Sequence, residues 1–189
     1  MPWLNVPHLQ QSEAGWCLPA CVAMVAAYWQ QPLTQADIAR WLDTRGVGTP
    51  AGRIERLTQR GFQVVYRTGS LAELETWLAQ SVPCILFLRT GELPYWQVDT
   101  PHAVVLVGLE ADHAYLLDPA VETAPVKVSL DDLLLAWSYS NTPMQLCPHP
   151  PDTILVSAAL EESMNPRFKG IFPGRVVNKR LTFNQKRSA

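Results

Sequence analysis

Long hydrophobic runs are missing from this sequence. The longest apolar stretch, CLPACVAMVAAYW at residues 17–29, is too short to span a bilayer and contains a proline. Residues 1–16 carry no Lys or Arg and lack the apolar core of a secretory signal. The sequence therefore predicts a cytoplasmic protein with no membrane span, whose four cysteines stay reduced.

Signatures of nucleotide and zinc binding are absent as well. No glycine-rich loop of either nucleotide-binding type occurs. Cys17 and Cys21 are four residues apart and do not form a Cys-x-x-Cys turn. His113 and His149 fall in segments expected to be loops, and the spacing matches no standard structural zinc pattern. A metal site is the least favoured hypothesis, and we expect neither a metal nor a cofactor.

Acidic residues stop at Glu162. The first 162 positions hold all 17 acidic residues and eight basic ones, whereas seven basic residues and no acid follow from Ser163. This last stretch has no sustained helical or strand periodicity. We therefore expect one domain at residues 1–160 and a basic, weakly ordered tail at residues 161–189. The acidic body opposes nucleic-acid binding, which would depend on the tail alone.

What the chain does contain is typical of a globular protein, with 48% hydrophobic and 17% charged residues. The first eighty residues look mainly helical. Thr34 with Asp37, Pro50 before AGRIERLTQR and Ser70 with Glu73 are helix-start patterns, and FQVVYRT has strand character.

The second half contains short β-branched or apolar runs separated by Gly, Pro, Asp and Glu. These runs are VPCILFLR, HAVVLVGLE, AYLLD, APVKV and TILVSAAL, with one short helix, LLLAW, after Ser129. A helical first lobe followed by strands, without βαβ alternation, predicts an α+β fold with an antiparallel sheet.

Cys17 lies where a polar loop becomes a helix. The unpaired N–H groups and the positive end of the helix dipole at this position stabilise a thiolate. The same N–H groups can donate to an oxyanion that forms on a substrate carbonyl. Cys21, one turn further, and Cys84, inside CILFL, are interpreted as core residues, which is the usual role of an isolated cysteine.

Three other residues complete a possible nucleophilic site. If HAVVLVGLE and AYLLD form a hairpin, His102 at the start of one strand lies beside Asp118 at the end of the other. One ring nitrogen can then face a thiol while the other donates to the carboxylate. Gln11, six residues before Cys17 and across a turn at Gly15, can supply an amide as a second oxyanion donor.

The order Gln, Cys, His, Asp resembles the papain-like cysteine peptidases. It is most similar to the bacterial peptidase family that removes double-glycine leaders from bacteriocin precursors, and to its stand-alone relatives. The matching stretches are VPHLQQSEAGWCLPACVAMVAAYW, LPYWQVDTPHAVVLVGLE and AYLLDPA, and the similarity spans about residues 5–157. The resemblance implies a papain-like fold and a peptide or protein substrate. It also implies that Cys17 is the nucleophile, His102 the base and acid, Asp118 the orienting group and Gln11 the oxyanion donor.

The sequence departs from that family around the nucleophile. Trp16 and Leu18 flank Cys17, where the leader peptidases usually have Asp and Gly. We expect Leu18 to narrow the approach to the thiol and Trp16 to provide a wall for the substrate. In LPYWQVDT, the loop before His102, Tyr95 and Trp96 are the candidates for contact with substrate.

Two functions from different classes follow. The main hypothesis is a thiol hydrolase, a cysteine peptidase acting through a covalent thioester. The alternative is a catalytically idle module that keeps the peptidase-like fold and cleft to bind a peptide, which the changes at Trp16 and Leu18 would allow.

Overall fold

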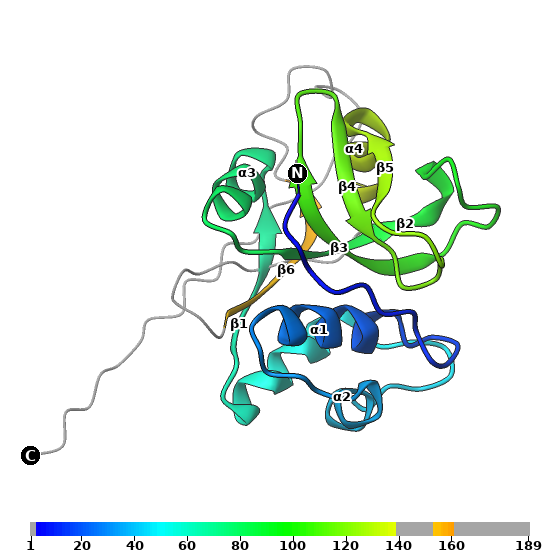
Figure 1. Ribbon diagram of the computed structural model, residues 1–189. Helices are drawn as coiled ribbons and strands as arrows, with labels where there is room; N and C mark the ends of the chain where they lie inside the picture. Colours follow the sequence, from blue (N-terminus) through cyan, green and yellow to red (C-terminus); the bar gives the residue numbers. More distant parts are fainter. Residues whose placement is uncertain (1–2, 139–152, 161–189) are drawn as a thin grey trace, which may run out of the picture.

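A six-stranded sheet forms the centre of the molecule (Figure 1). The computed structural model describes residues 3–138 and 153–160 of the 189. The strand order is β1-β6-β2-β3-β4-β5. The strands are β1 (Gln63–Gly69), β2 (Cys84–Arg89), β3 (Pro101–Leu109), β4 (His113–Leu117), β5 (Val126–Ser129) and β6 (Thr153–Leu160).

The sheet is mixed in strand direction. Strands β2, β3, β4 and β5 pair antiparallel, as expected from the sequence. Strands β1 and β6 pair in parallel, and β6 is also parallel to β2. Because β6 occupies the position between β1 and β2, the chain makes one crossover through a helix, β1–α3–β2, which the sequence analysis did not predict. The α+β class with a helical N-terminal lobe is confirmed, and the antiparallel description holds for four of the six strands.

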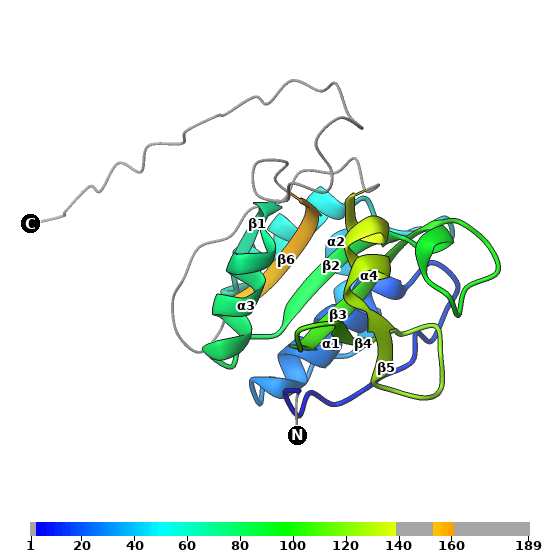
Figure 2. The same cartoon turned by 90° about the horizontal axis from the view of Figure 1, so that it is seen from above.

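Helices cover both faces of the sheet (Figures 1 and 2). On one face lie the N-terminal helices, and on the other lie α3 and α4. The helical elements are α1 (Cys17–Tyr28), α2 (Gln35–Leu42), the 3₁₀ helix η1 (Ala51–Arg60), α3 (Leu71–Ala79), the short 3₁₀ helix η2 (Thr90–Glu92) and α4 (Leu130–Ser138). Within the described ranges, no helix is both long enough and apolar enough to cross a membrane.

The continuous hydrophobicity of β2 and β3 follows from this arrangement. Alternate residues of β3 belong to different cores: Val104 and Leu106 pack with α3 and α4, whereas Val105 and Val107 pack beneath α1. All four are at most 1% exposed. A strand buried on both faces has no polar face, so its sequence shows an apolar run without alternation.

Local signals set the helix boundaries. The Thr34 side chain accepts a hydrogen bond from the Asp37 N–H, and Ser70 forms a reciprocal capping box with Glu73. Gly61 ends η1 in the left-handed conformation, with φ of 89°. The predicted helix at residues 51–60 is therefore present, but it is a 3₁₀ helix.

Gly15 forms the turn that leads into α1, and we expect no other residue to be tolerated there. Its φ is +77°, and a Cβ at this position would lie 2.7 Å from the Gly48 nitrogen and 2.9 Å from the Gly46 oxygen. Gly15→Ala should thus destabilise the fold by more than the left-handed conformation alone, which costs about 1–2 kcal/mol.

Gly61→Ala is the matched control, because Gly61 also has positive φ but nothing lies within 4 Å of an added Cβ. Denaturant unfolding of both variants measures the difference. Equal losses of stability in the two variants would show that the close approach of the Gly46–Gly48 turn to Gly15 adds nothing to the cost of the substitution.

The chain before α1 crosses the sheet as an N-terminal strap, defined here as residues 3–11. At its start, the Trp3 ring lies 4.7 Å from the ring of Tyr115. Its hydrogen bonds are Leu4 N–H to Val107 O (2.8 Å), His8 Nε2–H to Asp118 O (2.9 Å) and Gln11 N–H to Pro119 O (2.8 Å). The strap therefore follows the β3–β4 hairpin from one end of the sheet to the other.

Candidate active site

Cys17 is the first residue of α1, and its thiol is partly exposed. Trp16 occupies the N-cap position without a side-chain hydrogen bond, so the first-turn N–H groups have no capping side chain. Burial raises the pKa of the Cys17 thiol. The hydrogen bond and charge of His102, with backbone hydrogen bonds from Ala103 and Leu18, outweigh burial and bring that pKa below its usual value. The arrangement favours a thiolate.

His102, the second residue of β3, joins the thiol to a carboxylate. Its Nε2 lies 2.7 Å from Oδ1 of Asp118, and the imidazole lies near enough to Cys17 to lower the pKa of the thiol. Register explains the contact: Val105 pairs with Leu117, so Asp118 lies opposite Val104 and is a diagonal neighbour of His102 on the same face. The hairpin predicted from the sequence thus brings the two side chains together.

Charge favours the protonated imidazole. Burial lowers the pKa of His102, but the hydrogen bonds and charges of Asp118 and Cys17 outweigh burial and raise the pKa to about 9. His102 is 6% exposed, which reduces screening by water. The pKa of Cys17 is lowered and that of His102 is raised, so both shifts favour a thiolate–imidazolium pair, whose titrations belong to the pair as a whole.

Asp118 is 0% exposed and accepts four hydrogen bonds. Its Oδ1 accepts from His102 Nε2 and from the Ala120 N–H at 2.8 Å. Its Oδ2 accepts from the Tyr95 hydroxyl at 3.0 Å and from Trp96 Nε1 at 2.9 Å. Burial raises the pKa of Asp118, but the hydrogen bonds and the charge of His102 outweigh burial and lower it below its usual value. The carboxylate is therefore held ionised.

Tyr95 and Trp96 thus contact the carboxylate, a role that the sequence analysis missed. The Trp96 ring also lies 4.9 Å from the imidazole ring of His102. The expected contact of these two residues with a substrate stays a prediction. A signal was present in the sequence: two aromatic residues that each carry a hydrogen-bond donor precede the histidine by six or seven positions.

Gln11 lies at the same end of the sheet as Asp118, because its N–H donates to Pro119 O at 2.8 Å. Its side-chain Oε1 is buried and accepts no hydrogen bond from the described part of the protein. A buried acceptor of this kind is uncommon. Gln11 is held by the strap and not by α1, and the expectation that its amide faces the thiol stays a prediction.

Leu18 and Trp16 differ in their surroundings. Leu18 is 1% exposed and packs in the core beneath α1. It offers no surface to a substrate, so the prediction that it narrows the approach to the thiol is wrong. The reason is that α1 is enclosed on all sides: every residue from Leu18 to Ala26 is buried. Trp16 is partly exposed, and its contact with substrate stays a prediction.

The other cysteines and histidines lie apart from this chemistry. Cys21 and Cys84 are buried, as expected, and burial raises the pKa of both thiols. His113 begins β4, although the sequence analysis placed it in a loop. Cys147 and His149 lie outside the described residues, as does the predicted tail at 161–189. Within residues 3–138 and 153–160, no three His, Cys, Asp or Glu side chains could together hold a metal ion.

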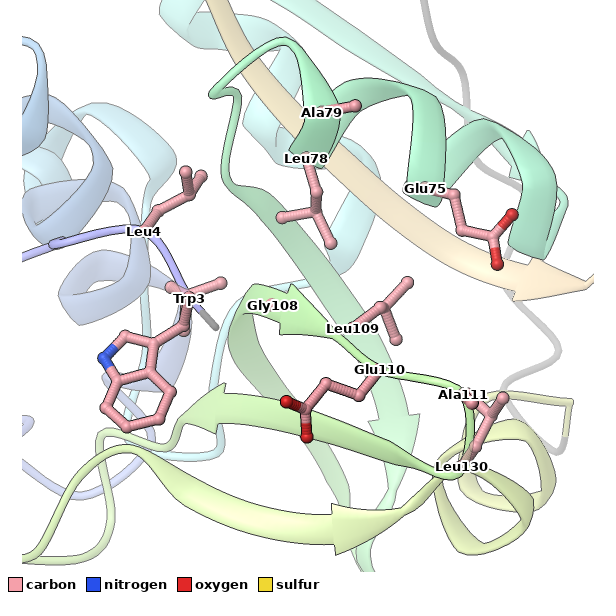
Figure 3. A pocket seen from close by; sticks show the side chains of 11 residues that line it. Trp3, Leu4, Glu75, Leu78, Ala79, Gly108, Leu109, Glu110, Ala111 and Leu130 are labelled. Atoms are coloured by element: carbon pink, nitrogen blue, oxygen red, sulfur yellow. The ribbon is translucent and has the colours of Figure 1, made fainter. Parts of the chain in front are cut away.

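A pocket of about 510 Å³ lies at the opposite end of β3 from His102 (Figure 3). Trp3 of the strap, Leu78 of α3 and Leu109 of β3 line it, and the last two point toward each other across it. Leu109 lies seven positions after His102 in β3, a span of roughly 20 Å along the strand. This pocket is therefore separate from the candidate active site.

Solved structures of peptidases resemble this fold. A C39-like peptidase from Bacillus anthracis has a TM-score of 0.59 at 18% identity, over 71% of this chain and 91% of that chain. The peptidase domain of Streptococcus ComA, a bifunctional ABC transporter, has 0.54 at 20%, over 69% and 88%. A double-glycine-motif protease from an AMS/PCAT transporter, solved with the leader peptide, has 0.51 at 25%, over 69% and 84%.

Sequence comparison gives the same family. No curated protein matches this chain. The family model described as Peptidase C39-like matches residues 3–142, which include every residue of the site described above. This chain therefore belongs to the Peptidase C39-like family.

Proposed function

We propose that this protein is a cysteine peptidase that cleaves a peptide bond through Cys17, His102 and Asp118. The observation that carries the proposal is the position of His102, which bonds Asp118 Oδ1 at 2.7 Å and lies near enough to the Cys17 thiol to lower its pKa. This arrangement is the one that a thiol nucleophile requires: a base that removes its proton and a third group that orients the base.

The reaction follows from these contacts. The Cys17 thiolate attacks the carbonyl carbon of the substrate, and the negative charge moves to the carbonyl oxygen. The Gln11 side-chain amide and the first-turn N–H groups of α1 are the proposed donors to that oxygen. The imidazolium of His102 then protonates the departing amine, the C–N bond breaks, and a thioester remains on Cys17.

Water completes the cycle. His102, now neutral, removes a proton from a water molecule that attacks the thioester carbonyl. The C–S bond breaks, the carboxylate product leaves, and the thiolate–imidazolium pair is restored. Asp118 stays ionised throughout and holds the imidazole in one orientation.

The substrate that we propose is a peptide or an extended segment of a protein. Support comes from the double-glycine-motif protease with a similar fold, which was solved with a leader peptide. Whether a double-glycine sequence is what this chain cleaves depends on the residues around Cys17, where Trp16 replaces a small acidic side chain of the resembled family.

Alkylation of the native protein with iodoacetamide tests the proposed nucleophile. We expect Cys17 to react first at pH 7, because its pKa is lowered and the other described thiols are buried. In His102→Ala the rate should fall by about tenfold or more, since a thiol at its ordinary pKa is only a few per cent ionised at that pH. Mass spectrometry of tryptic peptides identifies the labelled cysteine.

Two results would contradict the proposal. One is equally slow labelling of every cysteine. The other is a wild-type protein that captures a peptide intact with an affinity that Cys17→Ser leaves unchanged, which is the behaviour of an idle binding module.

A further inference from the structure

The loop between β2 and β3, residues 90–100, is fixed by its own hydrogen bonds. Thr90 is 0% exposed, and its hydroxyl donates to Val98 O at 2.6 Å and accepts from the Thr100 N–H at 2.9 Å. Asp99 accepts from the Gly91 N–H at 3.1 Å and forms an ion pair with Arg89. We call this segment the β2–β3 loop, and its network makes it a rigid support.

The β2–β3 loop delivers two aromatic side chains to one oxygen atom. The backbone N–H of Trp96 donates to Leu93 O at 3.1 Å, and Leu93 is 1% exposed in the core beside α4. From this anchored turn, the Tyr95 hydroxyl and Trp96 Nε1 both reach Oδ2 of Asp118. The backbone of the turn is thus tied to the core, and its side chains are tied to the carboxylate.

We propose that Tyr95 and Trp96 are positioning residues that hold Asp118 in the orientation in which Oδ1 faces His102. The inference rests on the proposed function. It gives Tyr95 and Trp96 a role at the Asp118 carboxylate, whereas the sequence analysis expected them to contact a substrate. Neither residue needs to touch the reacting atoms.

The separation of donors between the two oxygens supports this role. Among the described residues, Oδ1 accepts from His102 and Ala120, whereas Oδ2 accepts only from the two aromatic residues. With both oxygens engaged, rotation of the carboxylate would break several bonds in a site that water does not enter. Without Tyr95 and Trp96, rotation would break only the bonds of Oδ1.

Trp96 also protects the hydrogen bond that it helps to position. Its ring lies 4.9 Å from the imidazole at an interplanar angle of 58°, and His102 is 6% exposed. A smaller ring would open space for water beside the bond between His102 and Asp118. Water raises the local dielectric constant and weakens that bond.

Tyr95→Phe and Trp96→Phe remove one donor each and keep an aromatic ring. The direct readout is the NMR titration of the His102 imidazole, and the second is the iodoacetamide rate of Cys17 at pH 7. We expect the imidazolium titration to move down from about 9 in each variant, and further in the double variant. Alkylation and kcat should fall by roughly tenfold in the double variant with KM little changed.

Tyr115→Phe is the matched control. The Tyr115 hydroxyl also donates to a carboxylate, Oε2 of Glu110 at 2.7 Å, but on the other side of the β3–β4 hairpin. The control should leave the His102 titration unchanged even if stability drops. A purely structural role for Tyr95 and Trp96 predicts that all three variants behave alike, and that result would overturn the proposal.

An upward shift of the His102 titration in Tyr95→Phe or Trp96→Phe would also overturn the proposal. Such a shift would mean that the aromatic donors only withdraw negative charge from the Asp118 carboxylate. The test separates this inference from the proposed function. If the wild-type protein hydrolysed no peptide while the His102 titration still shifted in Tyr95→Phe, the peptidase activity would fail and the positioning role would stand.

Discussion

Cys17→Ala should reduce peptide hydrolysis by roughly 10³-fold or more, the scale on which catalysis collapses when a nucleophile is removed. The loss should appear in kcat, because the proposed mechanism needs a sulfur that forms a thioester. The substitution should cost little stability, since the Cys17 side chain is only partly buried. Steady-state hydrolysis of a peptide that wild-type protein cleaves gives the ratio, and circular dichroism verifies the fold.

Cys84→Ala is the control for removal of a thiol. Cys84 is 1% exposed at the start of β2, so its loss should cost stability but leave kcat within about twofold. Hydrolysis that survives in Cys17→Ala would assign the reaction to another nucleophile and remove the basis of the mechanism.

Asp118→Asn should have the second largest effect, on both stability and activity. Each carboxylate oxygen accepts two hydrogen bonds from N–H or O–H donors. If the NH₂ group replaces Oδ1, the Ala120 N–H faces a donor; if it replaces Oδ2, Trp96 Nε1–H does, while the Tyr95 hydroxyl can turn and accept. Leaving one such buried donor unpaired costs about 1–3 kcal/mol in the free energy of unfolding. A carboxylate therefore fits this set of donors better than an amide.

The kcat of Asp118→Asn should also fall, on the order of 10²- to 10⁴-fold, because His102 loses the carboxylate that orients its ring and stabilises its positive charge. The pH dependence of activity should also shift, in a direction that the His102 pKa determines. The raised pKa of His102 depends on Asp118, so the alkaline limb of activity, near pH 9 in wild-type protein, should move to lower pH. Asp112→Asn is the control, because Asp112 is exposed in the turn between β3 and β4, at the other end of the hairpin from His102. An unchanged alkaline limb in Asp118→Asn would contradict the assignment.

Features that depend on neighbouring residues could be predicted from the sequence. The caps at Thr34 and Ser70 and the end of a helix at Gly61 each involve groups within three or four positions. The pairing of His102 with Asp118 was also accessible, although they are 16 residues apart, because a hairpin fixes which residues of two strands meet.

Long-range contacts could not be predicted. Strand β6 pairs with β1 and β2 across a separation of about seventy to ninety residues, and nothing in TILVSAAL identifies these partners. The contacts of Tyr95 and Trp96 with Asp118 depend on how the β2–β3 loop folds back, which no local period encodes. Leu18 is a different case: it begins a continuous apolar run that is buried along its length, from Leu18 to Ala26, and the analogy with the family motif was given too much weight.

The two groups proposed to act on a substrate carbonyl are attached to different parts of the protein. Gln11 belongs to a segment that backbone hydrogen bonds fasten to β3 and to the residues after β4, whereas Cys17 belongs to a helix in the core. Local opening of the first eleven residues would withdraw the amide while helix and sheet stay folded. A fusion partner or proteolytic cut at the amino terminus is therefore expected to slow turnover strongly, while thermal stability falls only by the packing of Trp3, Leu4 and Val6 that is lost.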